Sequence, residues 1–595
     1  MENLQEKLDI ALDLLNEENF TEAQIILQEI INNDPQNVEA IKNLALCEVN
    51  LDNPPEAIKL FEKAIELNSE DATSIFYLGS CLSRVGNKEE AIEKFNKVIE
   101  LRPDYSEVYK NLAMIHVECG QLDKAIETIH QALNNPGIES DYTLNYILAT
   151  SYMLKKDVIK AIIYLEKALK LNENHLPIMN SLSSCYMGIG EYEKAKEILE
   201  KAYKVDEQNA LTVFNLGVLY QTTENYKEAL KYFQISYQLD PSTTMLASLA
   251  NCALKAEEYA IASTVYKNLL MIYPNNTEYR YAYIEALENI QEYKEALDSV
   301  NTLLSMDEKN IELIKKKGAL LRKLGFCEEA IETLNELLNR GKIDVELYYN
   351  LAYSYVAIGD FDNAKEMFKK CIILEPENPY AHKDLGVLYL KMNCYEWAVD
   401  EMTEAINLED DIAEFHYSLG VAHLMLNEVQ EGKKAILKSI ELEPNNPDAL
   451  AFLGYIYMLE RDFDKALEPI QKALDIEPDN FLAKSHGAKY YFQIKKYNVA
   501  KQFLQDIIEQ TQDDETMNML GICYLEEKDY ESALGIFFKL LQMYPKNHIL
   551  LTNLAKCEYN CNKKDEAIEH LRQALMVFND YQDALDLLEE INNGK

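Results

Sequence analysis

Apolar residues recur along the chain with the spacing of paired helices. In the stretch that begins at Val345 they fall three or four positions apart in two successive runs, which is the period of a helix with one buried face. The first face contains Tyr348, Leu351, Ala352 and Tyr355, and the second contains Ala364, Phe368 and Cys371. Gly359 lies between the runs, where a left-handed helix end favours glycine. The stretch therefore predicts two helices joined by a short turn.

A small residue in the second helix marks the same repeat unit throughout the chain. It recurs from Ala23 to Ala567, a span of 544 residues or sixteen steps of 34, in which one step is 36 and two are 33. A second series lies twelve positions upstream, from Ala11 to Ala555, and only Ile284 in it is bulky. Two small residues per repeat predict a close contact between its helices, which a larger side chain would overpack at a cost of about 1–3 kcal/mol.

Seventeen repeats account for residues 4–581. We expect residues 1–3 to form an N-terminal tail and residues 582–595 a C-terminal capping helix, because Glu589 stands where a further repeat would carry its small residue. Irregular packing is expected at 134–141, where two residues are inserted, and at 277–344, where Arg280 and Lys317 occupy apolar positions.

The charge of the chain argues against two classes of partner. It has 58 Lys and Arg against 101 Asp and Glu, a net charge of −43. Such a surface repels phosphate within the Debye length, about 8 Å at physiological salt, so we expect neither nucleic acid nor an anionic membrane as a partner. No run approaches 18 apolar residues, and the first twenty residues lack the basic start and apolar core of a signal peptide. We therefore expect a cytoplasmic protein whose eleven cysteines are free thiols.

The repeat resembles the tetratricopeptide repeat, a 34-residue helix–turn–helix with Leu-Gly and then Tyr in its first helix and Ala in its second. The motif stands here as Leu216-Gly217-Val-Leu-Tyr220, Leu385-Gly386-Val-Leu-Tyr389 and Leu453-Gly454-Tyr-Ile-Tyr457. The resemblance covers nearly the whole chain. It implies an all-α fold, a right-handed superhelical α-solenoid of about seventeen repeats, in which the first helix of each repeat (helix A) lines a concave groove.

Helix A carries aromatic residues and asparagines on the face that the resemblance assigns to the groove. Aromatic side chains supply contact area, and asparagine both donates to and accepts from a peptide backbone. Counted from the start of each repeat, position 5 holds Tyr146, Phe214, Tyr281, Tyr349 and Tyr417, position 6 holds Asn43, Asn111, Asn215 and Asn350, and position 9 holds Tyr353. We expect these residues to contact a bound peptide.

A basic patch stands out on the same face against the acidic background. It consists of Lys315, Lys316, Arg322 and Lys323 in the tenth repeat and Lys383 and Lys391 in the twelfth. Two interpretations stay open. The patch is either an anchor for an acidic or carboxylate-bearing peptide, or it pairs with neighbouring carboxylates such as Glu312.

Neither of two groove uses known in the family is predicted here. A carboxylate clamp needs Lys at position 5 and Asn at position 9 of one helix, but Lys110 precedes Met114, and Asn251 follows Ala247. An asparagine ladder is broken, because position 6 is asparagine in only five of the seventeen repeats.

The repeat leaves no residues for a catalytic domain, and no phosphate loop or HExxH motif occurs. Cys557, Cys561 and His570 suggest a metal site, and His416 and His423 share a helix face, but both sets are better explained by packing. Six cysteines share one phase of the repeat, as packing residues do: Cys47, Cys81, Cys185, Cys252, Cys523 and Cys557. We predict no catalytic residue, metal or cofactor.

The sequence therefore favours a non-catalytic protein–protein interaction scaffold that binds peptide or helical segments of protein partners in its concave groove. The alternative is a regulatory or targeting subunit of an enzyme complex whose catalytic chain is separate. A metal-dependent enzyme is disfavoured, and the identity of the partner and the oligomeric state are left open.

Overall fold

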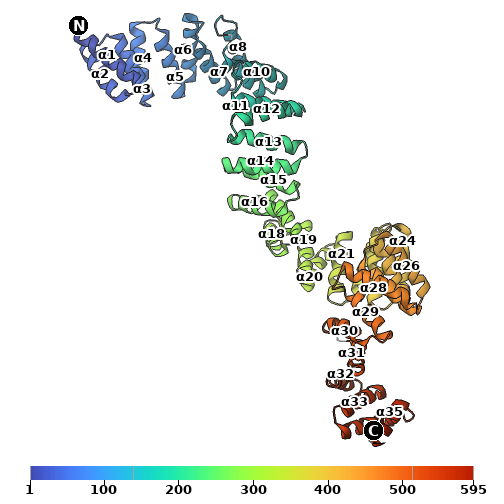
Figure 1. Ribbon diagram of the computed structural model, residues 1–595. Coiled ribbons are helices and arrows are strands. Elements are labelled where there is room, and N and C mark those ends of the chain that lie inside the picture. The colour runs from blue at the N-terminus through green and yellow to red at the C-terminus, as the bar shows by residue number, and fades with distance from the viewer. Residues whose placement is uncertain (1, 139, 512, 594–595) are drawn as a thin grey trace. The chain divides into compact units, whose positions relative to one another are not determined.

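The computed structural model describes residues 2–138, 140–511 and 513–593, which form thirty-five α-helices and no strand (Figure 1). The first seventeen helices are α1 (Glu2–Asn16), α2 (Phe20–Asn33), α3 (Val38–Asn50), α4 (Pro54–Leu67), α5 (Ala72–Arg84), α6 (Lys88–Leu101), α7 (Ser106–Glu118), α8 (Leu122–Leu133), α9 (Tyr142–Leu154), α10 (Val158–Leu171), α11 (Leu176–Gly188), α12 (Tyr192–Val205), α13 (Ala210–Thr222), α14 (Tyr226–Leu239), α15 (Thr243–Lys255), α16 (Tyr259–Ile272) and α17 (Thr277–Asn289).

The remaining helices are α18 (Tyr293–Met306), α19 (Ile311–Lys323), α20 (Cys327–Asn339), α21 (Val345–Ala357), α22 (Phe361–Leu374), α23 (Pro379–Lys391), α24 (Tyr395–Leu408), α25 (Ala413–Met425), α26 (Val429–Leu442), α27 (Pro447–Leu459), α28 (Phe463–Ile476), α29 (Phe481–Gln493), α30 (Tyr497–Thr511), α31 (Asp514–Glu526), α32 (Tyr530–Met543), α33 (His548–Asn560), α34 (Lys564–Val577) and α35 (Gln582–Asn593).

The odd-numbered helices up to α33 are the A helices of the repeat, and the even-numbered helix after each is its partner, helix B. The prediction of an all-α solenoid of helix pairs is thereby confirmed. Helices that pack closely are neighbours or next neighbours along the chain, as in other repeat proteins. The right-handed superhelical course stays a prediction.

The turn between helices A and B requires one residue in the left-handed region. Gly359 has φ 79°, as predicted, and the amide of Asp360 donates to the carbonyl of Tyr355 at 2.9 Å. In the next repeat Asn393 takes the same conformation with φ 57°, because asparagine tolerates it better than most residues.

The small residues of the repeat lie where helices A and B approach each other. A Cβ placed on Gly217 would lie 2.8 Å from the ring of Phe233, and one on Gly454 would lie 2.4 Å from Ile470. Real side chains do not approach so closely, so the larger residue of helix B fills the space that glycine leaves. The close contact predicted from the second small-residue series is present at these positions.

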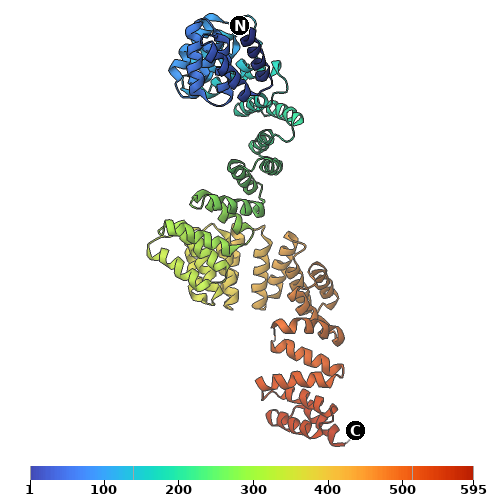
Figure 2. The ribbon, with the colours of Figure 1, turned by 90° about the vertical axis from the view of Figure 1, so that its left-hand side faces the viewer.

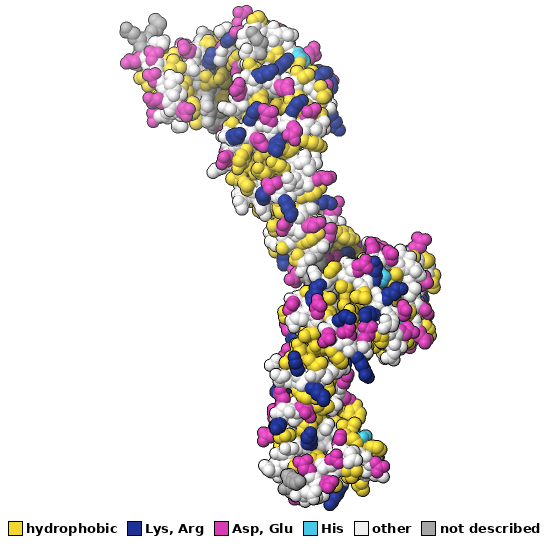
Figure 3. Space-filling model, turned by 45° about the vertical axis from the view of Figure 1, so that its right-hand side comes forward, with side chains coloured by type: hydrophobic (Ala, Val, Ile, Leu, Met, Phe, Trp, Pro, Cys, Tyr) yellow, Lys and Arg dark blue, Asp and Glu magenta, His cyan; other side chains and the backbone are white. Residues whose placement is uncertain are grey.

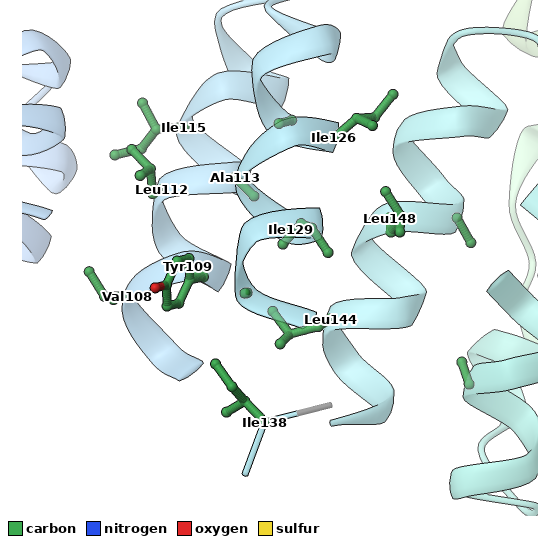
Figure 4. Packing of buried hydrophobic residues seen from close by; sticks show 14 of the residues in the cluster. Val108, Tyr109, Leu112, Ala113, Ile115, Ile126, Ile129, Ile138, Leu144 and Leu148 are labelled. Carbon is green, nitrogen blue, oxygen red and sulfur yellow. The ribbon is translucent and has the colours of Figure 1, made fainter. Parts of the chain in front are cut away.

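The chain divides into two compact halves, one up to Ser299 and one from Val300. Within each half, consecutive helices lie side by side in chain order (Figures 1 and 2). In the N-terminal half a continuous apolar core runs through successive repeats, and Figure 4 shows part of it between α7, α8 and α9.

The two-residue insertion at 134–141 is packed into this core. Helix α8 ends at Leu133, and Ile138 is buried beside Leu144 of α9 (Figure 4). Asn135 donates from Nδ2 to the hydroxyl of Tyr109 at 3.0 Å. The insertion therefore covers the end of the helix pair, although residue 139 lies outside the described residues.

Residues 277–344 form helices of ordinary length, α17 to α20, with local changes of side chain. Arg280 stands at an apolar position and donates from Nη2 to the carbonyl of Pro274 at 2.7 Å. Ile284 is buried at a small-residue position, and Lys317 is half-buried at a leucine position.

The helix boundary at the N-terminus differs from the expected one, whereas α35 begins at Gln582, the first residue of the expected capping segment. Helix α1 begins at Glu2, inside the segment expected to be an N-terminal tail. Helix α35 packs on α33 and α34, with Ala584 and Ile591 buried and Glu589 exposed. The last two residues of the expected capping segment, 594–595, lie outside the described residues.

Candidate protein-interaction surface

Lysines at position 5 of helix A tie successive repeats together. In four repeats the ammonium group pairs with an acid at the start of the next helix A, and in three of these the acid is the N-cap residue. The pairs are Lys42–Asp71 (3.5 Å), Lys110–Asp141 (2.7 Å), Lys315–Asp344 (3.2 Å) and Lys383–Glu414 (3.2 Å). A lysine at position 5 thus forms an ion pair between successive repeats. This structural role explains why such lysines occur without the position-9 asparagine that a carboxylate clamp needs.

Lys315 is held by three carboxylates. Its side chain is only 9% exposed, and its Nζ lies 3.0 Å from Glu312, 3.2 Å from Asp344 and 3.1 Å from Glu346. Burial opposes the charged form, but the hydrogen bonds to these carboxylates outweigh it and raise the pKa of Lys315. For this residue the contacts agree with the second interpretation, pairing with neighbouring carboxylates, and a role in anchoring a peptide stays a prediction.

The other lysines of the basic patch differ in exposure. Lys383 is partly buried, and its Nζ also lies 3.0 Å from Asp384, so it too pairs within the stack. Lys316 is half-buried. The sequence predicted the partner Glu312 but missed the partners supplied by the next helix A.

The predicted residues of the tenth and eleventh repeats do come together. We call Arg322, Tyr349, Asn350, Tyr353 and Asp384 the Arg322 cluster, which spans α19, α21 and α23. The Arg322 Nε donates to Asn350 Oδ1 at 3.3 Å, and its guanidinium lies 5.4 Å from the centre of the Tyr353 ring. Tyr349 and Tyr353 stack with ring centroids 6.2 Å apart, and the Tyr353 hydroxyl donates to Asp384.

The cluster contains two tyrosines, Tyr349 and Tyr353, whose phenol groups are neutral. Burial and the hydrogen bond to Asp384 raise the pKa of Tyr353, and burial raises the pKa of Tyr349. Tyr353 is 38% exposed, so one edge of the cluster can contact a ligand. Most of its polar groups, however, bond to one another.

The remaining predicted residues vary in how much surface they offer. Tyr281 is 45% exposed, whereas Tyr417 is half-buried against Phe452 and burial raises its pKa. Asn43 donates to the backbone carbonyl of Glu39 at 2.9 Å, and Asn111 is half-buried.

A small hollow lies on helices α9, α11 and α13 of the N-terminal half. Its volume is about 250 Å³, and its lining includes the predicted residues Tyr146 and Asn215. Asn215 is buried and donates to Asn180 Oδ1 at 3.0 Å, while Phe214 packs on Phe233 beneath. Asn180 is a buried polar residue that the sequence analysis did not single out.

A larger hollow opens along the groove face of α15. We call it the Asn251 hollow; its volume is about 560 Å³, and it is lined by Gln221, Thr243, Thr244, Ala247, Ser248, Asn251, Tyr266, Tyr273, Asn276 and Tyr279. Among these lining residues every polar group is a hydroxyl or an amide, and none is charged. The rings of Tyr266 and Tyr273 lie 6.1 and 6.3 Å from that of Tyr279, and burial raises the pKa of Tyr266 to about 12.

Sequence reasoning missed this hollow, although a signal was present. Position 5 of the repeat is Ala247, where many other repeats have an aromatic residue or lysine. The missing side chain leaves space, and Asn251 lies one turn further along the same face. The signal is an unusually small side chain at position 5, and a search for functional side chains does not detect it.

The residues considered for metal binding are engaged in packing. The six cysteines of common phase are buried, which confirms the prediction that they are packing residues, and all eleven cysteines are free thiols. His570 bonds through Nδ1 to Glu558 at 2.8 Å, and His423 through Nδ1 to Glu428 at 2.7 Å. Within the part of the chain that the structure describes, no three metal-ligating side chains gather into a site.

Comparison with known proteins identifies the family. Models of the tetratricopeptide repeat match residues 8–72, 48–106, 84–136, 142–175, 176–209, 212–243, 345–378, 417–481 and 524–591. Together these matches cover more than half of the chain and lie in both halves. The chain belongs to the tetratricopeptide repeat family, and its repeats support a protein-interaction scaffold.

Solved structures similar to this chain share little sequence with it. They include the crystal structure of MamA (24% identity, 28% of this chain and 95% of that chain, TM-score 0.26). They also include the structure of Naa15/Naa10 bound to HypK-THB (15% identity, 99% and 96%, TM-score 0.28) and the crystal structure of the APC/C hetero-tetramer Cut9-Hcn1 (15% identity, 98% and 95%, TM-score 0.29). At these TM-scores the likeness carries no functional information. No curated protein matches the chain.

In residues 2–138, 140–511 and 513–593, no helix is both long and apolar enough to pass through a membrane.

Proposed function

We propose that this chain is a non-catalytic scaffold that binds an extended, uncharged polar segment of a protein partner on its helix-A face. The observation that carries the proposal is the Asn251 hollow, in which nine of the ten lining residues supply hydroxyls, amides or tyrosine rings and none is charged. Its volume of about 560 Å³ falls within the range of specific ligand sites.

The chemistry of the lining suits a peptide backbone. An asparagine or glutamine side chain offers both a donor and an acceptor, so Asn251 and Gln221 can pair with a peptide group in either direction. The hydroxyls of Ser248 and Thr244 are equally adaptable, and the ring of Tyr273, which is 44% exposed, offers apolar contact. A charged segment would lose its hydration in this hollow without gaining a counterion, which favours a neutral one.

A substitution that restores the usual side chain tests the proposal. Ala247→Tyr should fill the hollow, because other repeats accommodate an aromatic residue at this position. Ala260→Tyr is the matched control, since Ala260 is exposed on helix B of the same repeat. Wild type and both variants are immobilised, and the recovered partner chains are identified and quantified by mass spectrometry.

We expect Ala247→Tyr to lower recovery of the specific partner by about tenfold or more, equivalent to about 1.4 kcal/mol of binding free energy. Ala260→Tyr should leave it unchanged. Equal recovery by wild type and Ala247→Tyr would rule out this hollow as the binding site.

A further inference from the structure

In three repeats a pair of stacked rings covers the core on the side away from the groove. The first ring stands at position 11 of helix A and the second at position 23, in helix B. The pairs are Tyr152–Tyr164 (centroids 5.7 Å apart, planes 5° apart), Tyr220–Tyr232 (5.4 Å, 5°) and Tyr491–Phe503 (5.8 Å, 8°). Beneath the first two pairs the position-7 leucines, Leu148 and Leu216, are 0% and 2% exposed.

The thirteenth repeat, formed by α25 and α26, has no tyrosine or phenylalanine at either position. Position 11 is His423 and position 23 is Ala435. The leucine at position 7, Leu419, is only half-buried here. A pocket of about 470 Å³ opens over it, with Ile406 of α24 and Leu437 of α26 in its lining.

The helices of this repeat cannot close the pocket by moving together. Gly432 takes the place of the usual alanine, and a Cβ on it would lie 3.1 Å from the backbone oxygen of Gly420. Helices α25 and α26 are therefore already in backbone contact, and the space left by the missing rings stays open.

The polar groups in the pocket lining are of mixed charge, with one unpaired cation. Lys438 pairs with Glu441 at 3.2 Å, and the exposed Glu431 adds another carboxylate. Lys434 has no ion-pair partner among the residues that the structure describes. His423 uses Nδ1 for its bond to Glu428, and its Nε2 has no hydrogen bond within the same residues.

We propose that this pocket, the thirteenth-repeat pocket, binds an aromatic side chain of a protein partner, flanked by a carboxylate that meets Lys434. The incoming ring would take the place that a stacked pair takes in other repeats, over Leu419. A carboxylate beside the ring would pair with Lys434, the one ammonium group of the lining that has no counterion among the described residues. The chain as a whole has a net charge of −43. A tyrosine hydroxyl could also donate to the Nε2 of His423.

This site is distinct from the groove. His416, Leu419 and His423 lie three and four positions apart and share one face of α25, while Tyr417 is turned about 100° from His416. The two proposals are therefore independent. A result that rules out binding in the Asn251 hollow would not rule out the thirteenth-repeat pocket, and the converse also holds.

The test uses a variant in which the missing rings are restored. His423→Tyr/Ala435→Tyr places on the thirteenth repeat the pair found in the seventh, and Ala435→Tyr alone is the milder alternative if the double variant does not fold. A phage-displayed random peptide library is selected on the full chain and depleted on the restored variant. The enriched peptide is synthesised, and its affinity for each variant is measured by fluorescence polarisation.

We expect enriched peptides to share Tyr, Phe or Trp next to Asp or Glu. The synthetic peptide should bind the restored variant at least about tenfold more weakly than wild type, and Lys434→Gln should weaken binding several-fold at low salt. Ala247→Tyr, the groove variant, should leave its affinity unchanged.

Four results would overturn the proposal. The first is that no peptide is enriched or that the enriched peptides lack an aromatic residue. The second is equal affinity for wild type and the restored variant. The third is undiminished affinity when cyclohexylalanine replaces the aromatic residue. The fourth is a dimer in sedimentation that dissociates when the rings are restored, since the occupant would then be a second copy of this chain.

Discussion

His486 on α29 is buried in an aromatic environment without a hydrogen bond. Its ring lies 4.7 Å from that of Tyr455, nearly parallel at 15°, and 5.2 Å from that of Phe452. Neither ring nitrogen has a partner among the described residues. Burial, with a smaller contribution from Lys489, lowers the pKa of His486 to about 3.

His486 should make the C-terminal half sensitive to acid. An unfolded histidine titrates near pH 6.5, whereas the folded one stays neutral until about pH 3, so the unfolded state binds the extra proton between these values. The free energy of unfolding is therefore highest above pH 6.5 and falls as the pH drops below it. At pH 5 the loss caused by His486 is about 2 kcal/mol. We expect His486→Phe to remove this loss. The difference between the urea midpoint of unfolding of the variant and that of wild type should therefore grow, in favour of the variant, from pH 7.5 to pH 5.

His382→Phe is the matched control. His382 bonds through Nδ1 to Glu401 at 2.7 Å, so its replacement removes a satisfied hydrogen bond and should destabilise the chain near neutral pH. A constant difference between His486→Phe and wild type across this pH range would show that the ring does not titrate as described.

Single residues also show where prediction from the sequence stops. Tyr349, Asn350 and Tyr353 could be placed on one face from spacing alone, because helical periodicity fixes which side chains are neighbours within a helix. The bond from Arg322 to Asn350 and the pairing of Lys315 with Asp344 join different repeats. Such contacts depend on how one helix pair sits on the next, which spacing does not specify.

At the scale of the helix pair, the contact between helices A and B depends on the glycines that line it. A Cβ at Gly454 would lie 2.4 Å from Ile470 and 2.9 Å from the backbone oxygen of Ala466, so both a side chain and the backbone would have to move. At Gly487, in the middle of the next helix A, the nearest atom would lie at 3.5 Å, an ordinary contact.

These two glycines should respond oppositely to the same substitution. We expect Gly454→Ala to destabilise the chain by about 1–3 kcal/mol through overpacking. Gly487→Ala should be neutral or stabilise by up to about 1 kcal/mol, because alanine favours helix more than glycine. Thermal unfolding of both variants measures the difference, and equal effects would show that the two positions are not packed as described.

Helix pairs were the part of the fold most open to prediction. A period of 34 residues, apolar spacing and two small residues per repeat all indicate the same helix–turn–helix, so local and global preferences agree. The pocket of the thirteenth repeat was not predicted, because its lining comes from α24, α25 and α26, and spacing within one helix does not specify how different helices meet.

At the scale of the whole molecule, contacts are local along the chain. Closely packed helices are neighbours or next neighbours in sequence, so a weakened contact affects its own repeat and those beside it. In Figure 3 acidic and basic side chains are interspersed over the visible face, with no single uniform patch. Stability is accordingly a sum of repeats and their interfaces.

Damage to one repeat should therefore stay local. In Gly454→Ala, we expect hydrogen–deuterium exchange to accelerate in α25 to α30 and to remain at the wild-type rate in α7 to α9. Exchange followed peptide by peptide with mass spectrometry measures this, and the distant repeats are the internal control. Uniform acceleration along the chain would contradict a stack held by neighbour contacts alone.

The sequence by itself determined the helix pairs, their number and their family, because these follow from periodicity and from where small residues stand. The tertiary structure decided which polar groups are compensated and where space remains. Lys315 proved to be enclosed by carboxylates of two repeats, and the hollow beside Ala247 and the pocket over Leu419 appeared only once helices were packed. The physical reason is that charge compensation and empty volume depend on distances between residues far apart in the chain, whereas helical propensity depends on residues close together in it.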